Sequence, residues 1–120
     1  MLERIEPEVR NQLLDYSHHI FVTDGVGNLV WQSDNAGESS GSASALDMVV
    51  SAVRRMGQKR GAGELDSVLM SFDKLLVMVV RIRTGYLAVL ADDDTKPGLL
   101  LIQARQLQAA LDAGADHEQG

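Results

Sequence analysis

The feature that most constrains the fold is an unbroken apolar run near the middle of the chain, Leu75 to Val80. A strand with apolar side chains on both faces has to be covered from above and below, as the central strand of a layered domain is. The run is far shorter than the roughly 20 residues needed to cross a bilayer. A chain of 120 residues has room for one such core. We therefore predict a single domain in which helices pack on both faces of one sheet.

Four further strand-like runs complete this sheet. Residues 20–22 and 29–31 are rich in β-branched and aromatic side chains. They flank the turn-forming segment 23–28, which contains Gly, Asp and Asn, and together these segments predict a hairpin. A third strand is predicted from Glu64, with imperfect alternation through Phe72, and a last strand covers Tyr86 to Leu90. The sheet should therefore contain five strands joined largely by tight turns.

Helices are predicted at both ends of the chain. From Pro7 onward, apolar residues recur at helical spacing and form one face. After the last strand, Thr95 is the expected N-cap and Pro97 lies in the first turn of a second amphipathic helix. The tail, residues 113–120, is small and polar and is predicted to be flexible. The polar segment 34–41 is predicted to be a mobile surface loop.

A helix predicted from about Ser42 to Gln58 has an unusually wide apolar surface. Its polar residues Asp47, Ser51, Arg54 and Arg55 fall in one narrow sector. Apolar residues fill the rest, an arc of about 200°, against about 100° for a helix that covers one core. Such a helix needs two packing partners. We expect one to be its own sheet and the other to be a second protein chain.

These elements define the fold class. The order is α-β-β-α-β-β-β-α, and one antiparallel five-stranded sheet with helices on its faces accounts for every apolar stripe. We predict an α/β (α+β) domain covering residues 1–112.

No pattern in the sequence predicts catalysis, a metal or a cofactor. The chain has no cysteine, so thiolate nucleophiles and thiolate metal sites are excluded. The carboxylates of Asp92–Asp94 precede a helix and are expected to act as cap and dipole partners. His18 and His19 are neighbours and point in different directions. The glycines of segment 25–28 are followed by a strand, whereas a dinucleotide-binding loop needs a following helix. A small enzyme would rest only on isolated Asp, His and Ser residues.

The net charge of −6 opposes binding to a polyphosphate backbone, so no nucleic-acid partner is predicted. The N-terminus is charged from the outset and has no apolar signal core. We therefore expect a cytoplasmic protein that does not insert into a membrane.

Two features are candidates for docking a partner. Positive charge is concentrated in Arg54, Arg55, Lys59 and Arg60, which either forms a solvated helix end or docks an acidic partner surface. Trp31 lies in a short strand beside the polar loop. It either packs in the core or anchors an interface.

Several segments resemble the roadblock family, the dynein-light-chain-related domains. Residues 22–30, Val-Thr-Asp-Gly-Val-Gly-Asn-Leu-Val, are similar to the first hairpin of that family. Residues 86–92, with Pro97-Gly98-Leu99, are similar to its last strand and the entry to its final helix. The glycine-rich step into 64–68 also fits. The likeness extends from about Glu6 to Leu111 and implies a profilin-like, roadblock fold.

The resemblance also implies a mode of assembly. Roadblock domains form homodimers in which the third strands pair edge to edge and the second helices pack against each other. Carried over by position, the dimer interface comprises Leu46, Val49, Val50, Val53 and Met56 with the strand residues Glu64, Leu65, Asp66, Ser67, Val68, Leu69 and Met70.

Function follows from the resemblance as an expectation. Family members generally lack a catalytic centre, and many work with Ras-like small GTPases. We expect a homodimeric, non-enzymatic regulator or scaffold that binds a small GTPase and modulates its nucleotide cycle. The alternative is a structural adaptor subunit of a signalling or motor assembly without a GTPase partner.

Overall fold

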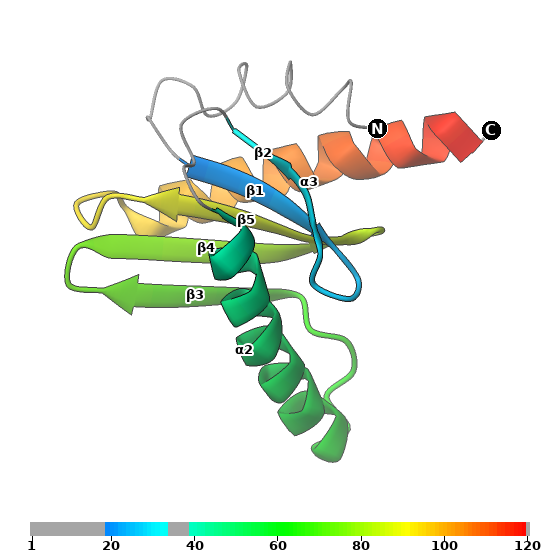
Figure 1. Ribbon diagram of the computed structural model, residues 1–120, viewed down its shortest axis with the longest axis horizontal. Coiled ribbons are helices and arrows are strands. Elements are labelled where there is room, and N and C mark those ends of the chain that lie inside the picture. The colour runs from blue at the N-terminus through cyan, green and yellow to red at the C-terminus, as the bar shows by residue number, and fades with distance from the viewer. Residues whose placement is uncertain (1–18, 34–38, 120) are drawn as a thin grey trace.

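The computed structural model describes residues 19–33 and 39–119. Along these residues the elements are β1 (His19–Asp24), β2 (Leu29–Gln32), α2 (Ser39–Lys59), β3 (Ser67–Phe72), β4 (Leu75–Ile82), β5 (Gly85–Ala91) and α3 (Pro97–Gln119). Figure 1 shows one sheet with a helix on each side. The helix predicted after Pro7 and most of the loop predicted at 34–41 lie outside the described residues.

The five strands form one antiparallel sheet in the order β2-β1-β5-β4-β3. This confirms the predicted sheet. The apolar run that begins at Leu75 lies in β4, between β5 and β3, and five consecutive residues from Leu76 to Val80 are buried. The sheet places its two edges at β2 and β3.

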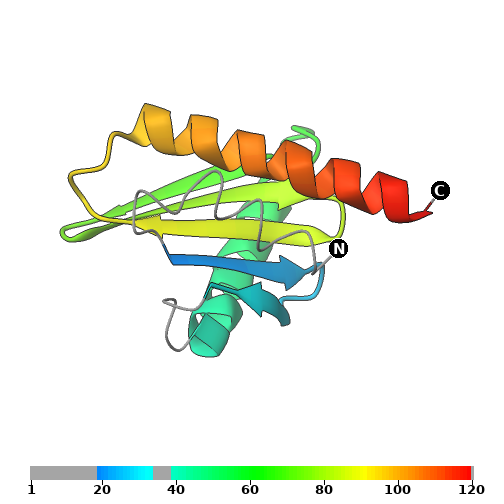
Figure 2. The ribbon, with the colours of Figure 1, turned by 90° about the horizontal axis from the view of Figure 1, so that it is seen from above.

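The helix α3 covers one face of the sheet (Figure 2). Its inward residues Leu100, Ala104 and Leu107 are completely buried and recur at the spacing of one helical face. They pack on alternate residues of β4 and β5, including Val80 and Leu87. This is the larger of the two apolar layers of the core.

The helix α2 lies on the opposite face (Figures 1 and 2). Its buried residues Leu46 and Val50 pack with Phe21, Val77 and Val79. Alternation along β4 explains the two layers, because successive strand residues point to opposite faces. The prediction that both faces of the central strand are covered is therefore confirmed.

The β1–β2 hairpin is closed by its own side chains. The carboxylate of Asp24 accepts hydrogen bonds from the backbone N–H groups of Val26 and Asn28 and from the side-chain amide of Asn28. The hydrogen bonds from Asn28 hold the pKa of Asp24 below its ordinary value. Gly27 follows with φ at +89°, a conformation that favours glycine. The residue types of this turn were sufficient to predict it.

Several predicted boundaries are corrected by the structure. Helix α2 begins at Ser39, three residues before the predicted start at Ser42. The third strand begins at Ser67, so Glu64, Leu65 and Asp66 precede it. The first i→i+4 bond of α3 runs from the N–H of Leu100 to the carbonyl of Lys96. Lys96, rather than Thr95, therefore occupies the N-cap position.

Helix α3 continues to Gln119, beyond the predicted end of the domain at residue 112. A flexible tail at 113–120 stays a prediction. Among the described residues, no helix combines the length and apolarity that spanning a membrane requires.

Candidate protein-interaction surface

Helix α2 carries an apolar surface that its own sheet does not cover. Ala45, Val49, Ala52 and Met56 lie within about 60° of one another around the helix axis, and we call them the apolar flank. All four are exposed, Val49 by 42% and Met56 by 61%. Methionine and valine side chains on a water-exposed surface indicate a contact site more often when they cluster than when they are isolated. Of the two packing partners predicted for this helix, a single chain therefore supplies one, its own sheet. The apolar flank stays available for the second.

The apolar flank borders a hollow of about 240 Å³ between α2 and the sheet. Every residue that lines it is apolar: Phe21, Ala45, Leu46, Val49, Met70, Phe72, Leu75, Val77 and Leu90. Phe72, at the end of the edge strand β3, is 56% exposed. The hollow therefore joins the apolar flank of α2 to the free edge of the sheet.

The direction of α2 leaves its C-terminal half without support. Figure 1 shows the helix crossing the sheet face and extending past β3. Arg60 and Gly61 close its end by hydrogen bonds to its last turns, so the helix keeps its shape in the overhanging part. Met56 lies in this part and presents its side chain to solvent.

The residues of the predicted dimer interface differ in how far the chain itself buries them. Leu46 and Val50 are buried under α2 and belong to the chain's own core. Val53 is half-buried, while Val49 and Met56 are exposed. On β3, Leu69 is exposed, and Ser67, Val68 and Met70 are half-buried. Of the residues before β3, Leu65 packs against the core layer under α2.

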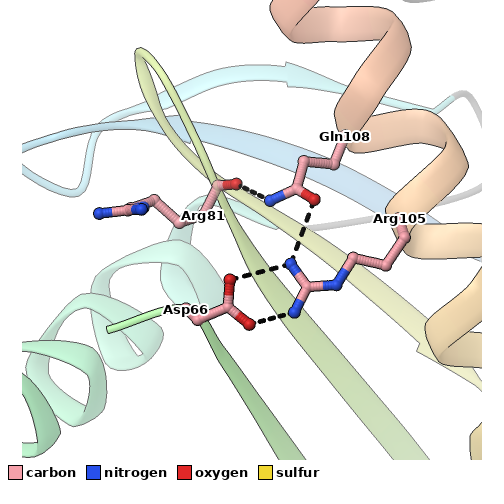
Figure 3. Close-up of polar contacts among 4 residues, drawn as sticks. All are labelled: Asp66, Arg81, Arg105 and Gln108. Atoms are coloured by element: carbon pink, nitrogen blue, oxygen red, sulfur yellow. Dashed lines mark hydrogen bonds and ion pairs between the residues drawn. The ribbon is translucent and has the colours of Figure 1, made fainter. Parts of the chain in front are cut away.

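Glu64 and Asp66 form ion pairs, Glu64 with Arg81 and Asp66 with Arg105. Figure 3 shows the guanidinium of Arg105 on α3 meeting both carboxylate oxygens of Asp66. Arg105 also donates to Gln108, whose side chain donates to the backbone carbonyl of Arg81. The Arg105 hydrogen bond lowers the pKa of Asp66, and Asp66 raises the pKa of Arg105. Asp66 therefore anchors the start of β3 to α3.

The four predicted basic docking residues lie along the second half of α2 and just past its end. Arg54 lines a groove with Arg81 and Arg83, two residues that no local sequence pattern links to it. Arg55 lines an adjoining hollow with Arg54. Lys59 and Arg60 lie at the far end of α2. The proximity of Arg54 to Arg81 depends on how α2 crosses the sheet, which the sequence pattern does not specify.

Trp31 lies on the other face of the sheet. It is partly buried and packs against the core layer under α3, and it pairs with the fully buried Val22 of β1. The structure therefore separates Trp31 from the arginines and from the apolar flank. No group of three or more His, Cys, Asp or Glu residues that could hold a metal ion occurs in the described part of the chain.

Known proteins share this fold although their sequences differ from that of this chain. No protein-family profile matches the sequence, and no curated protein matches it. Among solved structures, MglB of Myxococcus xanthus superimposes with a TM-score of 0.85 at 17% identity, over 94% of this chain and 95% of that chain. An MglB in a tetrameric arrangement gives a TM-score of 0.76 at 12% identity, over 97% and 88% of the two chains. A roadblock/LC7 domain from Streptomyces avermitilis gives 0.71 at 20% identity, over 82% and 84%.

The chain therefore has the roadblock-type fold. The similarity to MglB covers nearly the whole of both chains, so the fold correspondence includes the elements that carry the candidate surface. At these identities the comparison establishes the fold, and the expectation of a profilin-like, roadblock architecture is confirmed.

Proposed function

We propose that this chain forms a homodimer through α2 and β3 and, as a dimer, binds a Ras-like small GTPase in the cytoplasm and modulates its nucleotide cycle. It acts by binding and is not itself an enzyme. The observation that carries the proposal is the apolar flank of α2, with Met56 exposed by 61% and Val49 by 42%. A helix in water that exposes such a surface is expected to have a protein partner.

A second copy of the chain fits the apolar flank better than an unrelated partner does. The flank adjoins both an apolar hollow and the free edge strand β3. Pairing two β3 edges would satisfy unpaired backbone groups. It would also bring the overhanging half of each α2 over the sheet of the other copy. The tetrameric arrangement of one MglB structure supports self-association through this fold.

The GTPase partner rests on the roadblock fold. The family that the sequence resembles works with small GTPases in bacteria and eukaryotes. The same fold can carry different functions, and the nucleotide dependence of partner binding distinguishes a GTPase regulator from an adaptor.

The dimer is tested by sedimentation equilibrium of matched variants. Met56→Glu places a charge on the apolar flank, and burying an unpaired charge in an interface is costly. Gln58→Glu is the control, because Gln58 is exposed and lies about 160° from Met56 around the helix axis, on the side away from the apolar flank. We expect twice the chain mass for the wild type and for Gln58→Glu at micromolar concentration, and the chain mass for Met56→Glu. A wild-type monomer with a cooperatively folded sheet would contradict the dimer.

The partner is tested by capture from the lysate of the source organism. Tagged protein is incubated with a non-hydrolysable GTP analogue or with GDP, and bound proteins are identified by mass spectrometry. Enrichment of a small GTPase in one nucleotide state supports a regulator. Partners that do not depend on nucleotide, with no GTPase among them, would favour the alternative of a structural adaptor.

A further inference from the structure

The flank of α2 opposite to the apolar one borders a polar groove. Arg54 of α2, Arg81 of β4 and Arg83 of the β4–β5 turn line this hollow of about 210 Å³. The other lining residues are Gly25, Glu64, Ile82, Thr84, Gly85 and Tyr86. We call it the arginine groove. A second hollow, lined by Ser51, Arg54, Arg55 and Gln58, shares Arg54 with it. Both hollows lie on the same side of α2 and share the wall residue Arg54, and we call the two together the track.

This track is positive in a protein that is negative as a whole. The chain has a net charge of −6, yet the residues that line the two hollows include four arginines and one carboxylate, that of Glu64. Nearby Asp112 accepts a hydrogen bond from the backbone N–H of Arg83. Arg105 is already paired with Asp66, and Figure 3 shows the Arg81 side chain directed away from that pair. The Arg81 guanidinium therefore takes no part in the Asp66–Arg105 pair that anchors β3.

The positions of the cations favour an extended ligand. Arg54 and Arg81 come from a helix and a strand, and Arg55 extends the track along α2. Arg55 and Arg81 are exposed. A small enclosed anion would need donors converging on one point, whereas cations spaced along an open track suit successive carboxylates on a protein surface.

We propose that the arginine groove docks an acidic segment of the protein partner, with Arg54, Arg55 and Arg81 as the residues that bind its carboxylates. This proposal extends the proposed function. It rests on that function only where it assigns the acidic segment to the GTPase partner. The arginine groove would attract and orient an acidic segment, whose approach the net negative charge of the chain otherwise disfavours.

Glu64 makes the proposal testable in both directions. Its carboxylate Oε2 lies 3.6 Å from Nη1 of Arg81 and both side chains are largely exposed, by 70% and 46%. Glu64 therefore competes with an incoming carboxylate for the same guanidinium. Replacing it by the neutral glutamine should strengthen binding, which a purely structural ion pair does not predict.

The experiment uses the full chain and a fluorescein-labelled peptide of alternating glutamate and serine, followed by anisotropy at low ionic strength. The test variant is Arg54→Gln with Arg81→Gln. The matched control is Lys74→Gln with Lys96→Gln, which removes the same charge from two loops at the opposite end of the sheet (Figure 1). Because the peptide needs no GTPase, failure here and failure of the capture experiment are distinguishable.

We expect the arginine variant to bind the peptide about tenfold more weakly and the lysine variant to bind within about twofold of the wild type. Glu64→Gln should bind about twofold to fivefold more tightly. Equal losses in both double variants, or no gain in Glu64→Gln, would overturn the proposal. Displacement of the peptide by inorganic phosphate far more effectively than by chloride of equal ionic strength would also overturn it, in favour of a small-anion site.

Discussion

Gly85, the first residue of β5, has no room for a side chain. A Cβ atom at this position would overlap the backbone carbonyl oxygen of Thr23 on the neighbouring strand β1. Backbone atoms of a paired strand cannot move aside as a flexible side chain can. We predict that Gly85→Ala lowers the free energy of unfolding by about 2–4 kcal/mol, in the range of strained, overpacked substitutions. Urea denaturation followed by circular dichroism measures this change.

The control for this prediction is Gly98→Ala. Gly98 lies in the first turn of α3, and a Cβ there would meet nothing within 4 Å. Alanine favours the helix over glycine, so this variant should be unchanged or up to about 1 kcal/mol more stable. A loss in Gly98→Ala as large as in Gly85→Ala would show that the close approach to Thr23 is not the cause.

The Asp66–Arg105 pair gives stability a dependence on pH. Arg105 lowers the pKa of Asp66 below the ordinary value of 3.8. The contribution of the pair is therefore fully present above pH 3.8 and is lost as the pH falls through the folded-state pKa. Both side chains are partly exposed, so screening limits the contribution to about 0.2–1 kcal/mol.

This dependence is measured by comparing the wild type with Asp66→Asn at several pH values. The difference in free energy of unfolding should be constant from pH 7 to about pH 5 and should shrink as the medium becomes more acidic. Arg105→Gln and the double variant complete the cycle, and the coupling between the two positions should shrink in the same range. A difference that does not change down to pH 3 would contradict the assignment.

At the scale of elements, the two sides of α2 should have separable energetic effects. Val50 is 2% exposed and packs on the sheet, whereas Met56 is 61% exposed. We predict that Val50→Ala lowers the free energy of unfolding by about 1–3 kcal/mol at every protein concentration, because it leaves a cavity in the core. Met56→Ala should leave the dissociated chain as stable as before and weaken the dimer about tenfold.

Thermal unfolding over a range of protein concentrations distinguishes the two effects. A dimer melts at higher temperature when it is more concentrated. Val50→Ala should lower the melting temperature and keep this dependence, and Met56→Ala should lose the dependence over part of the range. If neither the wild type nor either variant shows any dependence, α2 does not contribute to an interface.

The sequence predicts these elements well where local chemistry determines them. The run beginning at Leu75 predicts β4, and the Asp24-to-Asn28 segment predicts its hairpin, because alternation and turn residues act over a few positions. The start of β3 is harder to predict. The apolar pattern of Leu65 suggests an earlier start, but Asp66 is held by Arg105, a residue 39 positions away. Long-range pairs of this kind leave no local signal.

The candidate site is predictable to a similar degree. The wide apolar arc of α2 predicted an uncovered surface, and the exposure of Val49 and Met56 agrees with it. The arginine groove could not be predicted, because Arg54 and Arg81 meet only through the crossing of α2 over the sheet. Alternation alone could have placed Arg81 on the same face as Val77 and Val79.

At the scale of the whole molecule, the two edges of the sheet are expected to differ, because only one of them pairs with a second copy. β2 forms one edge and β3 the other. In an antiparallel edge strand, alternate backbone N–H groups point away from the sheet and exchange with solvent. If two copies pair through β3, only its outward N–H groups gain partners, while those of β2 keep their exposure. One molecule thus contains both the test strand and its internal control.

We therefore predict that hydrogen exchange of the outward amides in Ser67–Phe72 slows by about tenfold or more when the protein is concentrated from below to above its dimer dissociation constant. The outward amides of Leu29–Gln32 should exchange at the same rate throughout. Met56→Glu should keep β3 in fast exchange at both concentrations, because the overhanging half of α2 no longer seats on the second sheet. Protection that rises equally at both edges would indicate general association rather than a β3-paired dimer. Protection that rises on α2 alone would indicate a dimer formed by helices without a continuous sheet.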